Sequence, residues 1–430
     1  MSATRALVFA AVAVISTSSP VVAQIHGELS VTFDLLPDPS DAPGLQTVGE
    51  LRTRLSARTA DQFGEHLRLI LSGHIDGLVA DRGALGAPSP TTTAVIEPEQ
   101  LLVVIPSSRE PGVEFRSGFS QVGWGRLDEF QPTDVVNPLD LTRFLLDGRR
   151  EAKLSVPLAG VYVFLPGETK IDAIVVPTFR AGRFDRLDES TSPFNLEGSP
   201  GLLVRRDEPA MTAGNLQGGA RVSSTVRRLD WGASVYRGFR SFPVLAGPSA
   251  AGTYVETFPR FTMVGGDFET VHGEWGVRGE AAAFVDDALQ VVSPGQVAPG
   301  LSAHDGHSID GGVGVDRKAG DYRVAADVLW SYRAAAGLHD SEATLVASAE
   351  RRFARDTRIV RVFAVYDPGD ALFVRTIATF SVRDNVAFEA SGGLFTGSPS
   401  VDRAIGLDAG GSLARFARRD FLYARLRISF

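Results

Sequence analysis

The segment that decides the fold is the last one in the chain, Asp420-Phe421-Leu422-Tyr423-Ala424-Arg425-Leu426-Arg427-Ile428-Ser429-Phe430. Successive side chains of a β-strand point to opposite faces, so period-two alternation separates this segment into two faces. One face is apolar, with Leu422, Ala424, Leu426, Ile428 and Phe430; the other is polar, with Tyr423, Arg425, Arg427 and Ser429. Such a strand suits a transmembrane β-barrel, with lipid outside and a water-filled interior. The alternative is an edge strand of a soluble β-sandwich.

The N-terminus predicts export. Arg5 precedes an apolar run from Ala6 to Ile15, which has the length of a signal peptide and is too short to be a membrane anchor. Val21 and Ala23 place small residues at the positions that signal peptidase reads, so the mature chain is expected to start at Gln24. We therefore expect a signal peptide over residues 1–23 and one domain over residues 24–430.

Composition excludes several classes of function. The 430 residues contain no cysteine, which rules out disulfides, thiolate metal sites and thiol catalysis. A net charge of −8 argues against nucleic acid as a partner, because nucleic-acid binding requires a basic surface. No apolar run after the signal peptide approaches the length of a transmembrane helix, and no linker divides the chain.

The alternation of the last segment recurs along the whole chain. In residues 26–35, Leu29, Val31 and Phe33 alternate with polar residues. The predicted strands are 26–35, 47–59, 65–79, 94–105, 113–124, 152–165, 169–180, 213–224, 229–238, 258–267, 273–285, 307–316, 322–332, 342–353, 357–366, 371–382, 385–395 and 420–430. We expect an all-β, antiparallel, up-and-down transmembrane barrel of about 18 strands.

The lengths of the links give independent support. Short links at 61–64, 166–168, 318–320, 354–356 and 383–384 alternate with long links at 80–93, 125–151, 181–212, 240–257, 286–306 and 396–419. Outer-membrane barrels have short turns on the periplasmic side and long loops on the extracellular side. A soluble sandwich has no reason to alternate in this way.

The link 125–151 is the candidate constriction of the barrel. Asn137 suits a helix N-cap, Pro138 suits the first helical position and Asp140 suits the helix dipole, so the sequence predicts a short helix here. The predicted constriction residues are Arg126, Asp128, Asp134, Asn137, Asp140 and Arg143. The alternative is an ordinary exposed loop helix.

Inward-facing arginines are the second candidate feature. The expected lumen-facing charges are Arg52, Arg54, Arg116, Arg375, Arg425 and Arg427. Closure of the barrel gathers them on one wall, opposite a set of inward acidic residues that includes Glu280, Asp316 and Glu350. Such walls would select solutes by charge. The alternative is a lumen in which charges pair locally between neighbouring strands.

Signals for catalysis are weak. His304 and His307 form a His-x-x-His pair in a predicted loop, where a solvated loop competes with a surface metal site. His66 and His74 face the lumen without a nucleophile at a suitable spacing. We expect no enzyme activity, no cofactor and no metal.

A family resemblance rests on three motifs: Val122-Gly-Trp-Gly125, Asp134-Val-Val-Asn-Pro-Leu-Asp140 and Val175-Val-Pro-Thr-Phe179. With the terminal Phe430, they resemble uncharacterised porin-like outer-membrane barrels of Gram-negative bacteria and, more distantly, alginate-export porins. The motif match covers roughly residues 95–185 and the last strand. The resemblance implies contact with outer-membrane lipids, recognition of the C-terminal strand by the barrel-assembly machinery, and envelope export machinery as a candidate partner. It brings no catalytic residues.

Together these observations predict an outer-membrane channel or transporter that passes a solute or export substrate through a polar lumen narrowed by an inward loop. The alternative is a loop-plugged barrel that serves as a docking component of an export system. A third class, an outer-membrane hydrolase, requires a Ser/His or Asp/His pair at the outer rim, and the spacing of residues shows none. Substrate, transport direction and oligomeric state are not determined by the sequence.

Overall fold

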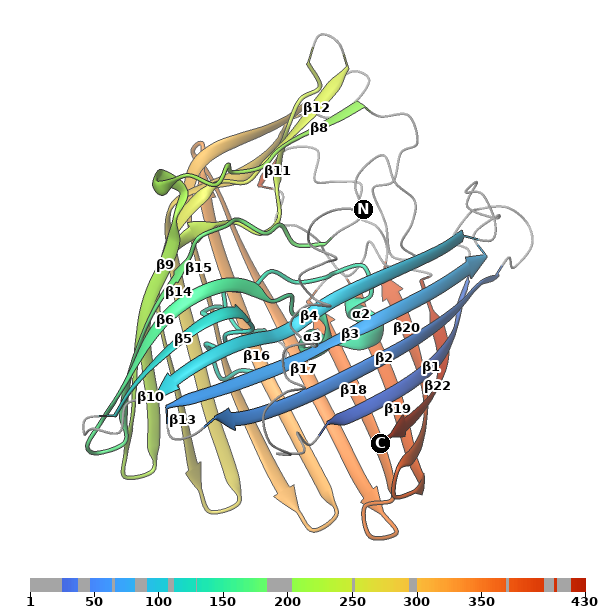
Figure 1. Cartoon of the computed structure of the whole chain (residues 1–430). Coiled ribbons are helices and arrows are strands. Elements are labelled where there is room, and N and C mark those ends of the chain that lie inside the picture. The colour runs from blue at the N-terminus through green and yellow to red at the C-terminus, as the bar shows by residue number, and fades with distance from the viewer. Residues whose placement is uncertain are drawn as a thin grey trace.

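The protein is a closed antiparallel β-barrel of 18 strands (Figure 1). The computed structural model describes residues 25–37, 47–63, 66–81, 91–106, 112–128, 130–183, 203–249, 252–293, 300–368, 371–397, 406–407 and 419–430. The strands of the barrel are β1 (His26–Pro37), β2 (Thr47–Phe63), β3 (Leu67–Asp81), β4 (Thr91–Pro106), β5 (Gly112–Ser120), β6 (Val156–Leu165), β7 (Thr169–Val176), β9 (Gln217–Val226), β10 (Leu229–Phe239), β13 (Arg260–His272), β14 (Trp275–Ser293), β15 (Gly300–Ala319), β16 (Tyr322–Ala335), β17 (Leu338–Phe353), β18 (Arg358–Asp367), β19 (Ala371–Arg383), β20 (Val386–Gly397) and β22 (Phe421–Ser429). Each pairs with the next, and β1 also pairs with β22, which closes the ring.

The predicted fold class is confirmed, and each predicted strand overlaps an observed one. The largest difference lies at 286–306, which the sequence predicts to be a loop. There β14 and β15 continue as a paired ribbon after a bulge between Phe284 and Asp287, up to Ser293 opposite Gly300. A ribbon that extends beyond the membrane has water on both faces, so its sequence lacks the apolar alternation that reveals the other strands.

Several strand ends also differ from the prediction, and two of them flank the link between β5 and β6. The predicted strand 113–124 ends as β5 at Ser120, and the predicted strand 152–165 begins as β6 only at Val156. Ala152 instead belongs to a short helix. Both differences arise because the link between these two strands folds into the barrel rather than continuing the sheet.

The turns at one rim are short and those at the other are mostly long, as predicted. We call the rim with turns at 166–168, 227–228, 273–274, 320–321 and 384–385 the short-turn rim. Gly273 and Gly320 have positive φ of 64° and 60°, a conformation that glycine adopts without strain. The opposite rim, the long-loop rim, has two exceptions: β16 and β17 are joined there through Ala336 and Gly337 alone, and only residues 368–370 separate β18 from β19. The predicted signal peptide (1–23) and much of the links at 80–93, 181–212 and 396–419 lie outside the described residues.

Apolar side chains cover the outside of the barrel. Phe33 is 47% exposed, Val328 55% and Leu422 62%. Their neighbours along each strand, such as Thr32 and Tyr423, face inward and are buried. A continuous apolar exterior of this extent marks a surface that contacts lipid. Among the described residues, no helix is long and apolar enough to cross a membrane.

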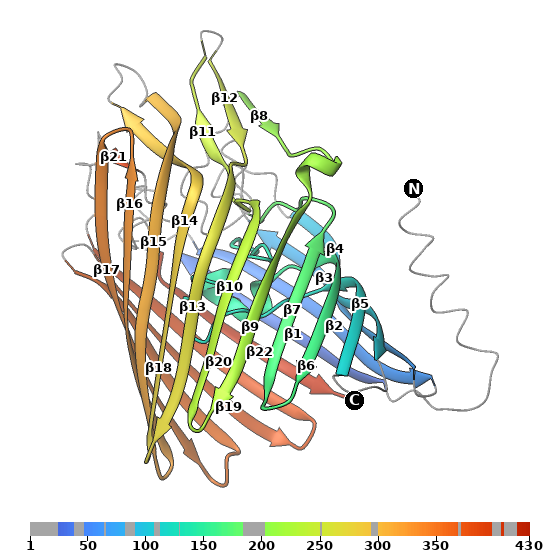
Figure 2. The same cartoon turned by 90° about the vertical axis from the view of Figure 1, so that its left-hand side faces the viewer.

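The long-loop rim carries a second, small sheet. Its strands are β8 (Leu203–Asp207), β11 (Val244–Ala246) and β12 (Thr253–Thr257), and they stand above the barrel in Figure 2. A two-residue strand, β21 (Gly406–Leu407), pairs with β14 at Val291 and Val292. By contrast, the described links of the short-turn rim at 166–168, 227–228, 273–274, 320–321 and 384–385 are tight turns.

Candidate functional site: a segment folded into the barrel

The described part of the link between β5 and β6, residues 121–128 and 130–155, lies inside the ring of strands (Figure 1). We call it the inward segment. It contains two one-turn helices, α2 (Phe144–Asp147) and α3 (Arg149–Ala152), which are seen within the barrel in Figure 1. The two helices are separated by Gly148, whose φ is 82°. The position of this segment makes it the feature that determines how much of the interior is filled.

The helix predicted to start at Asn137 is not present. Residues 138–140 are extended, because Leu139 and Asp140 form β-bridges with Lys153 and Arg183. The Asn137 side chain accepts a hydrogen bond from the Val122 N–H at 2.6 Å and donates to the carbonyl oxygens of Ser120 at 3.0 Å and Leu154 at 2.8 Å. Asn137 therefore fastens the start of the segment to its end, rather than capping a helix.

Arg143 joins the segment to the wall formed by β1 and β2. Its guanidinium group forms ion pairs with Glu50, at 2.5 Å, and with Asp34. Both carboxylates have side chains that are 0% exposed. A buried carboxylate is strongly destabilised without a cationic partner, so these two acidic residues hold Arg143 in place.

Asp147 forms the second connection to the same wall. It pairs with Arg52 of β2 and, at 2.7 Å, with Arg425 of β22. Burial acts to raise the pKa of the Asp147 carboxyl, but the guanidinium groups of Arg52, Arg143 and Arg425 outweigh burial and hold that pKa well below its ordinary value. Asp147 is therefore a carboxylate at any physiological pH.

Two further inward arginines bind the same helices. Arg375 of β19 donates hydrogen bonds to the carbonyl oxygens of Leu145 at 3.0 Å and Leu146 at 2.8 Å, at the end of α2. Arg54 of β2 pairs with Glu151 of α3 at 3.0 Å. Cations suit the C-terminal carbonyl groups of a helix, so the two Arg375 hydrogen bonds complement the local polarity of the backbone.

The other end of the segment is bound to the wall formed by β13 and β14. The Glu280 carboxylate accepts hydrogen bonds from the N–H groups of Arg126, Leu127 and Thr133 at 2.8, 3.3 and 2.7 Å, and from the Thr133 hydroxyl at 2.7 Å. Asp267 pairs with the Arg126 guanidinium at 2.8 Å. One buried side chain of the wall therefore orients a whole turn of the segment.

The same wall also binds Asp128. Other charged residues of the segment pair with one another. Asp128 pairs with Arg278 of β14 at 2.6 Å. Asp134 has a 0% exposed side chain and pairs with Arg149 at 3.0 Å and Lys153 at 2.5 Å. Burial lowers the pKa of Lys153, against the attraction of Asp134. These contacts make the segment a folded unit with its own charge pairs.

Apolar packing adds to the polar anchors. Trp124 is 1% exposed and meets Tyr236 of β10 edge to face, with ring centroids 6.2 Å apart. Val136 belongs to the same cluster. Leu146 of α2 packs among Phe373, Phe395 and Phe421 on the other side. The inward segment is thus in contact with apolar as well as charged patches on opposite parts of the inner surface.

The predicted constriction residues are all in this segment, and five of the six form ion pairs. Arg126, Asp128 and Arg143 reach the barrel wall, Asp134 pairs within the segment, and Asp140 pairs with Arg183 of the next long link at 3.1 Å. Sequence patterns do not single out Asp147 or Glu151 as site residues, nor Asp34 and Glu50 as the wall-side partners of Arg143. Asp34 and Glu50 could have been found from the sequence, because both are inward carboxylates near the same end of adjacent predicted strands.

The predicted lumen arginines do not form a free basic wall. Arg52, Arg54 and Arg425 are paired with acidic residues of the inward segment. Arg116 pairs with Glu114 at 2.6 Å, and Arg427 lies 3.4 Å from Glu389. On the opposite arc, Arg323, Arg333 and Arg352 pair with acidic neighbours on the same or adjacent strands. The geometry favours local pairing over a basic wall that faces an acidic wall.

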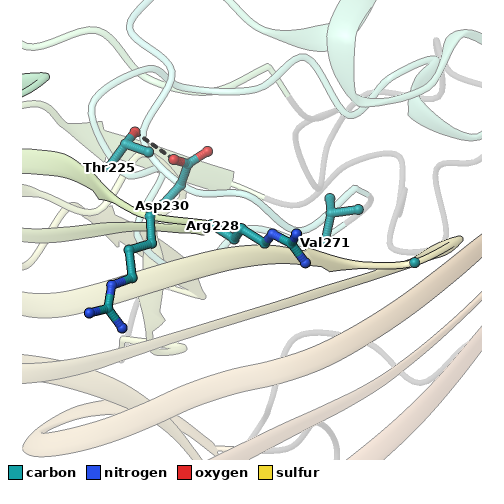
Figure 3. Close-up of a pocket in the computed structure, with 6 residues that line it drawn as sticks. Thr225, Arg228, Asp230 and Val271 are labelled. Atoms are coloured by element: carbon teal, nitrogen blue, oxygen red, sulfur yellow. Dashed lines mark hydrogen bonds between the residues drawn. The ribbon is translucent and has the colours of Figure 1, made fainter.

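Charged side chains remain accessible along β15 to β18. The Arg323 side chain is 53% exposed and the Arg352 side chain 46%, although both point inward. At the short-turn rim, a cleft of about 520 Å³ is lined by Thr225, Arg227, Arg228, Asp230, Val271 and Gly273 (Figure 3). Asp230 lies 3.7 Å from the Arg126 guanidinium, so the cleft reaches the inward segment. This cleft is therefore a solvent-open hollow that borders a residue in contact with the inward segment.

The histidine pairs have ordinary surroundings. His304 and His307 are on β15, not in a loop; His304 contacts the Ser302 hydroxyl at 3.1 Å, and His307 lies against Tyr332. His74 contacts the carboxylates of Glu99 at 3.1 Å and Asp76 at 3.7 Å. Within the described ranges, no group of three or more His, Asp or Glu side chains is placed to hold a metal ion.

The strands and the segment inside them define the fold class: a closed, 18-stranded antiparallel β-barrel with a folded segment in its interior. Among solved structures, Acinetobacter baumannii OccAB3 is similar over 95% of this chain and 99% of its own, with a TM-score of 0.50 and 8% identity. Pseudomonas aeruginosa OccK8 (OprE) has a TM-score of 0.46 and 10% identity, with 95% of this chain and 98% of that chain covered. The P. aeruginosa outer-membrane protein OpdK has a TM-score of 0.46 and 11% identity, with the same coverage. No family model and no curated protein matches the sequence.

Proposed function

We propose that this protein is a channel of the Gram-negative outer membrane through which a polar solute diffuses. The apolar exterior supports insertion in a membrane, and the signal peptide predicted from the sequence at residues 1–23 supports export. The short turns face the periplasm in this proposal, as in other outer-membrane barrels. A barrel of 18 strands is wide enough to hold an aqueous passage beside a folded segment.

The observation that carries the proposal is the attachment of the inward segment to two separate walls. Arg143 and Asp147 bind β1, β2 and β22, whereas Arg126 and Thr133 bind β13 and β14. A segment fixed at both sides narrows the interior at a constant position. Arg126, Asp128, Asp134, Asn137, Asp140 and Arg143 act in this proposal by holding that position rather than by contacting solute.

The solute path that we infer follows the inner faces of β15 to β18. Arg323 and Arg352 are exposed there, each beside an acidic partner, so cations and anions alternate along the path. Alternating charges favour polar or zwitterionic solutes over those of one sign. The distant resemblance suggests alginate or another acidic polymer as substrate. Such a polymer would require an excess of positive charge along the path, but each exposed arginine there is paired with a carboxylate.

A plugged barrel that docks an export system is the second candidate. The number of buried charged contacts favours it, because a segment held by Asp34, Glu50, Asp147 and Glu280 would leave its place rarely. In this reading a partner protein at one rim would displace the segment. Recognition by the barrel-assembly machinery through the last strand applies to either candidate, and Phe430 is exposed at the strand's end.

The absence of cysteine from the chain allows a direct test. In β17, Ser348 faces the interior and its neighbour Ala347 faces outward, so Ser348→Cys and Ala347→Cys form a matched pair. We would record conductance of each purified variant in planar bilayers, before and after a charged thiol reagent. For a channel, the reagent reduces the conductance of Ser348→Cys and leaves Ala347→Cys unchanged.

Three outcomes separate the candidates. Steady conductance with block at Ser348→Cys alone supports the channel. A folded protein that is silent, but conducts after Arg143→Ala, supports the plugged barrel. If neither the wild type nor Arg143→Ala conducts, and the thiol reagent does not label Ser348→Cys, an aqueous path along β17 is contradicted.

A further inference from the structure

The short-turn rim has a row of arginines and aromatic rings on its outer face, between β14 and β19. The row consists of Trp275, Arg317, Tyr322, Arg351, Phe353, Arg358 and Phe380. Their outward direction follows from the strand register. Trp275 is directly opposite Arg317, Tyr322 is opposite Arg351, and Arg358 is opposite both Phe353 and Phe380. Cross-strand partners point to the same face of a sheet, and Trp275, Tyr322 and Phe380 are exposed on the outside.

Arg351 is at the centre of this row. Its guanidinium carbon lies 4.8 Å from the centre of the Tyr322 ring and 4.4 Å from that of the Phe353 ring. The two rings hold the planar cation by cation–π contacts, and they leave the hydrogen-bond donors at its edge. Among the residues that the structure describes, no carboxylate lies within ion-pair distance of Arg351.

Arg358 is diagonally adjacent to Arg351 on the neighbouring strand, since Arg351 is opposite Val360. Such diagonal positions are about 7–8 Å apart, close enough for two long side chains to reach one anion. Arg358 is exposed and, in the described part of the chain, also has no carboxylate partner. Arg317 lies over the Trp275 ring at 5.3 Å and is paired with Glu274 at 2.6 Å, so it is the least available of the three.

The row is at the edge of the apolar exterior. Arg358 and Tyr322 are the first residues of their strands, and Val360 and Val324 follow on the same face. Val324 is 48% exposed. Aromatic rings at such a boundary lie at the level of lipid headgroups, where the phosphate of a phospholipid is found. Acyl chains of the same lipid would lie along Val324 and Val360.

We propose that Arg351 and Arg358 form a binding site for the headgroup of an anionic phospholipid in the membrane leaflet at the short-turn rim. Two cations without carboxylate partners are complementary to a lipid with a net negative charge, and basic residues clustered beside a membrane bind such lipids. The inward arginines beside the row do not compete, because Arg352 pairs with Glu350 and Arg323 pairs with Asp316. The proposal requires a membrane-spanning barrel but not a conducting one, so its failure is distinguishable from failure of the channel.

The test compares two doubly substituted full-length proteins of equal net charge. Arg351→Gln with Arg358→Gln removes the proposed site. Arg228→Gln with Arg237→Gln is the control. Arg228 lies in the turn between β9 and β10 and Arg237 lies on β10, so both are outside the row between β14 and β19. Binding of phosphatidylglycerol and phosphatidylcholine to the purified barrel would be measured by native mass spectrometry, with gel mobility and circular dichroism to verify the fold.

We expect the wild type and the control to prefer phosphatidylglycerol, and the Arg351/Arg358 variant to lose about thirty-fold of that affinity, the contribution of two basic residues near an anionic lipid. Equal binding of the two lipids by the wild type would overturn the proposal. Retention of the preference by the Arg351/Arg358 variant would also overturn it. Displacement of phosphatidylglycerol by millimolar inorganic phosphate would identify a free-phosphate site instead of a lipid site.

Discussion

Replacement of Arg143 by alanine should release α2 from the wall without unfolding the barrel. The substitution leaves Asp34 and Glu50 buried, with side chains that are 0% exposed, and without their shared cation. Removal of one partner of a buried ion pair typically costs about 3–5 kcal/mol. The strand ladder between β1 and β2 does not involve Arg143 and should remain intact.

This free-energy cost sets the expected change in the population of the form in which α2 is released from the wall. Each 1.4 kcal/mol changes an equilibrium about tenfold, so the released form should become roughly two to four powers of ten more populated. Single-channel recording should then show larger conductance or frequent transitions to a larger state. Limited proteolysis should cut within residues 144–152 faster than in the wild type.

Two further variants make the reasoning refutable. Asp34→Asn with Glu50→Gln in the Arg143→Ala background removes the unpaired charges, and we expect it to recover part of the protection from protease. Arg237→Ala is the matched control, because it breaks an exposed ion pair with Asp286 and should change nothing measurable. If Arg143→Ala had the conductance and cleavage rate of the wild type, the ion pairs would not determine the position of the segment.

Three other predictions concern the same segment. Glu280→Gln removes a charge that accepts four hydrogen bonds, each worth about 1.5–3 kcal/mol to a charged group, and should expose the turn around Thr133 to protease. Trp124→Ala empties a buried site beside Tyr236 and should lower the free energy of unfolding of the segment by about 3–5 kcal/mol, measured by hydrogen exchange. Because the pKa of Asp147 is lowered in the folded protein, its contribution to docking is complete above about pH 4 and is lost only as the pH falls through that lowered pKa, so conductance should show no transition from Asp147 between pH 5 and 8.

Each of these predictions has a contrary result. Unchanged cleavage near Thr133 in Glu280→Gln would mean that backbone contacts alone hold the turn. A loss of the whole barrel in Trp124→Ala would place this residue in the assembly of the sheet rather than in the segment. A conductance step near pH 6 that disappears in Asp147→Asn would show that the surrounding arginines do not keep this carboxyl ionised.

The sequence by itself determined the barrel. Alternation in segments such as 420–430 fixes which side chains face outward, because the side-chain period of a strand is two and lipid accepts only one of the two faces. The alternation of short and long links then orders the strands around the ring. The sequence could not show that β14 and β15 continue beyond 285, because water on both faces of a ribbon removes the pattern.

Only the tertiary structure decided where the inward segment binds. Asp34 and Arg143 are 109 residues apart, and Arg126 and Glu280 are 154 apart. No local pattern joins such pairs. The predicted helix at Asn137 was wrong for the same reason: propensity near Pro138 was outweighed by bridges to Lys153 and Arg183, which long-range folding brings alongside. The period of two along a strand shows which side chains face lipid and which face the water-filled interior. The contents of the lumen depend instead on pairing between distant charges, in a space that exists only once the barrel has closed.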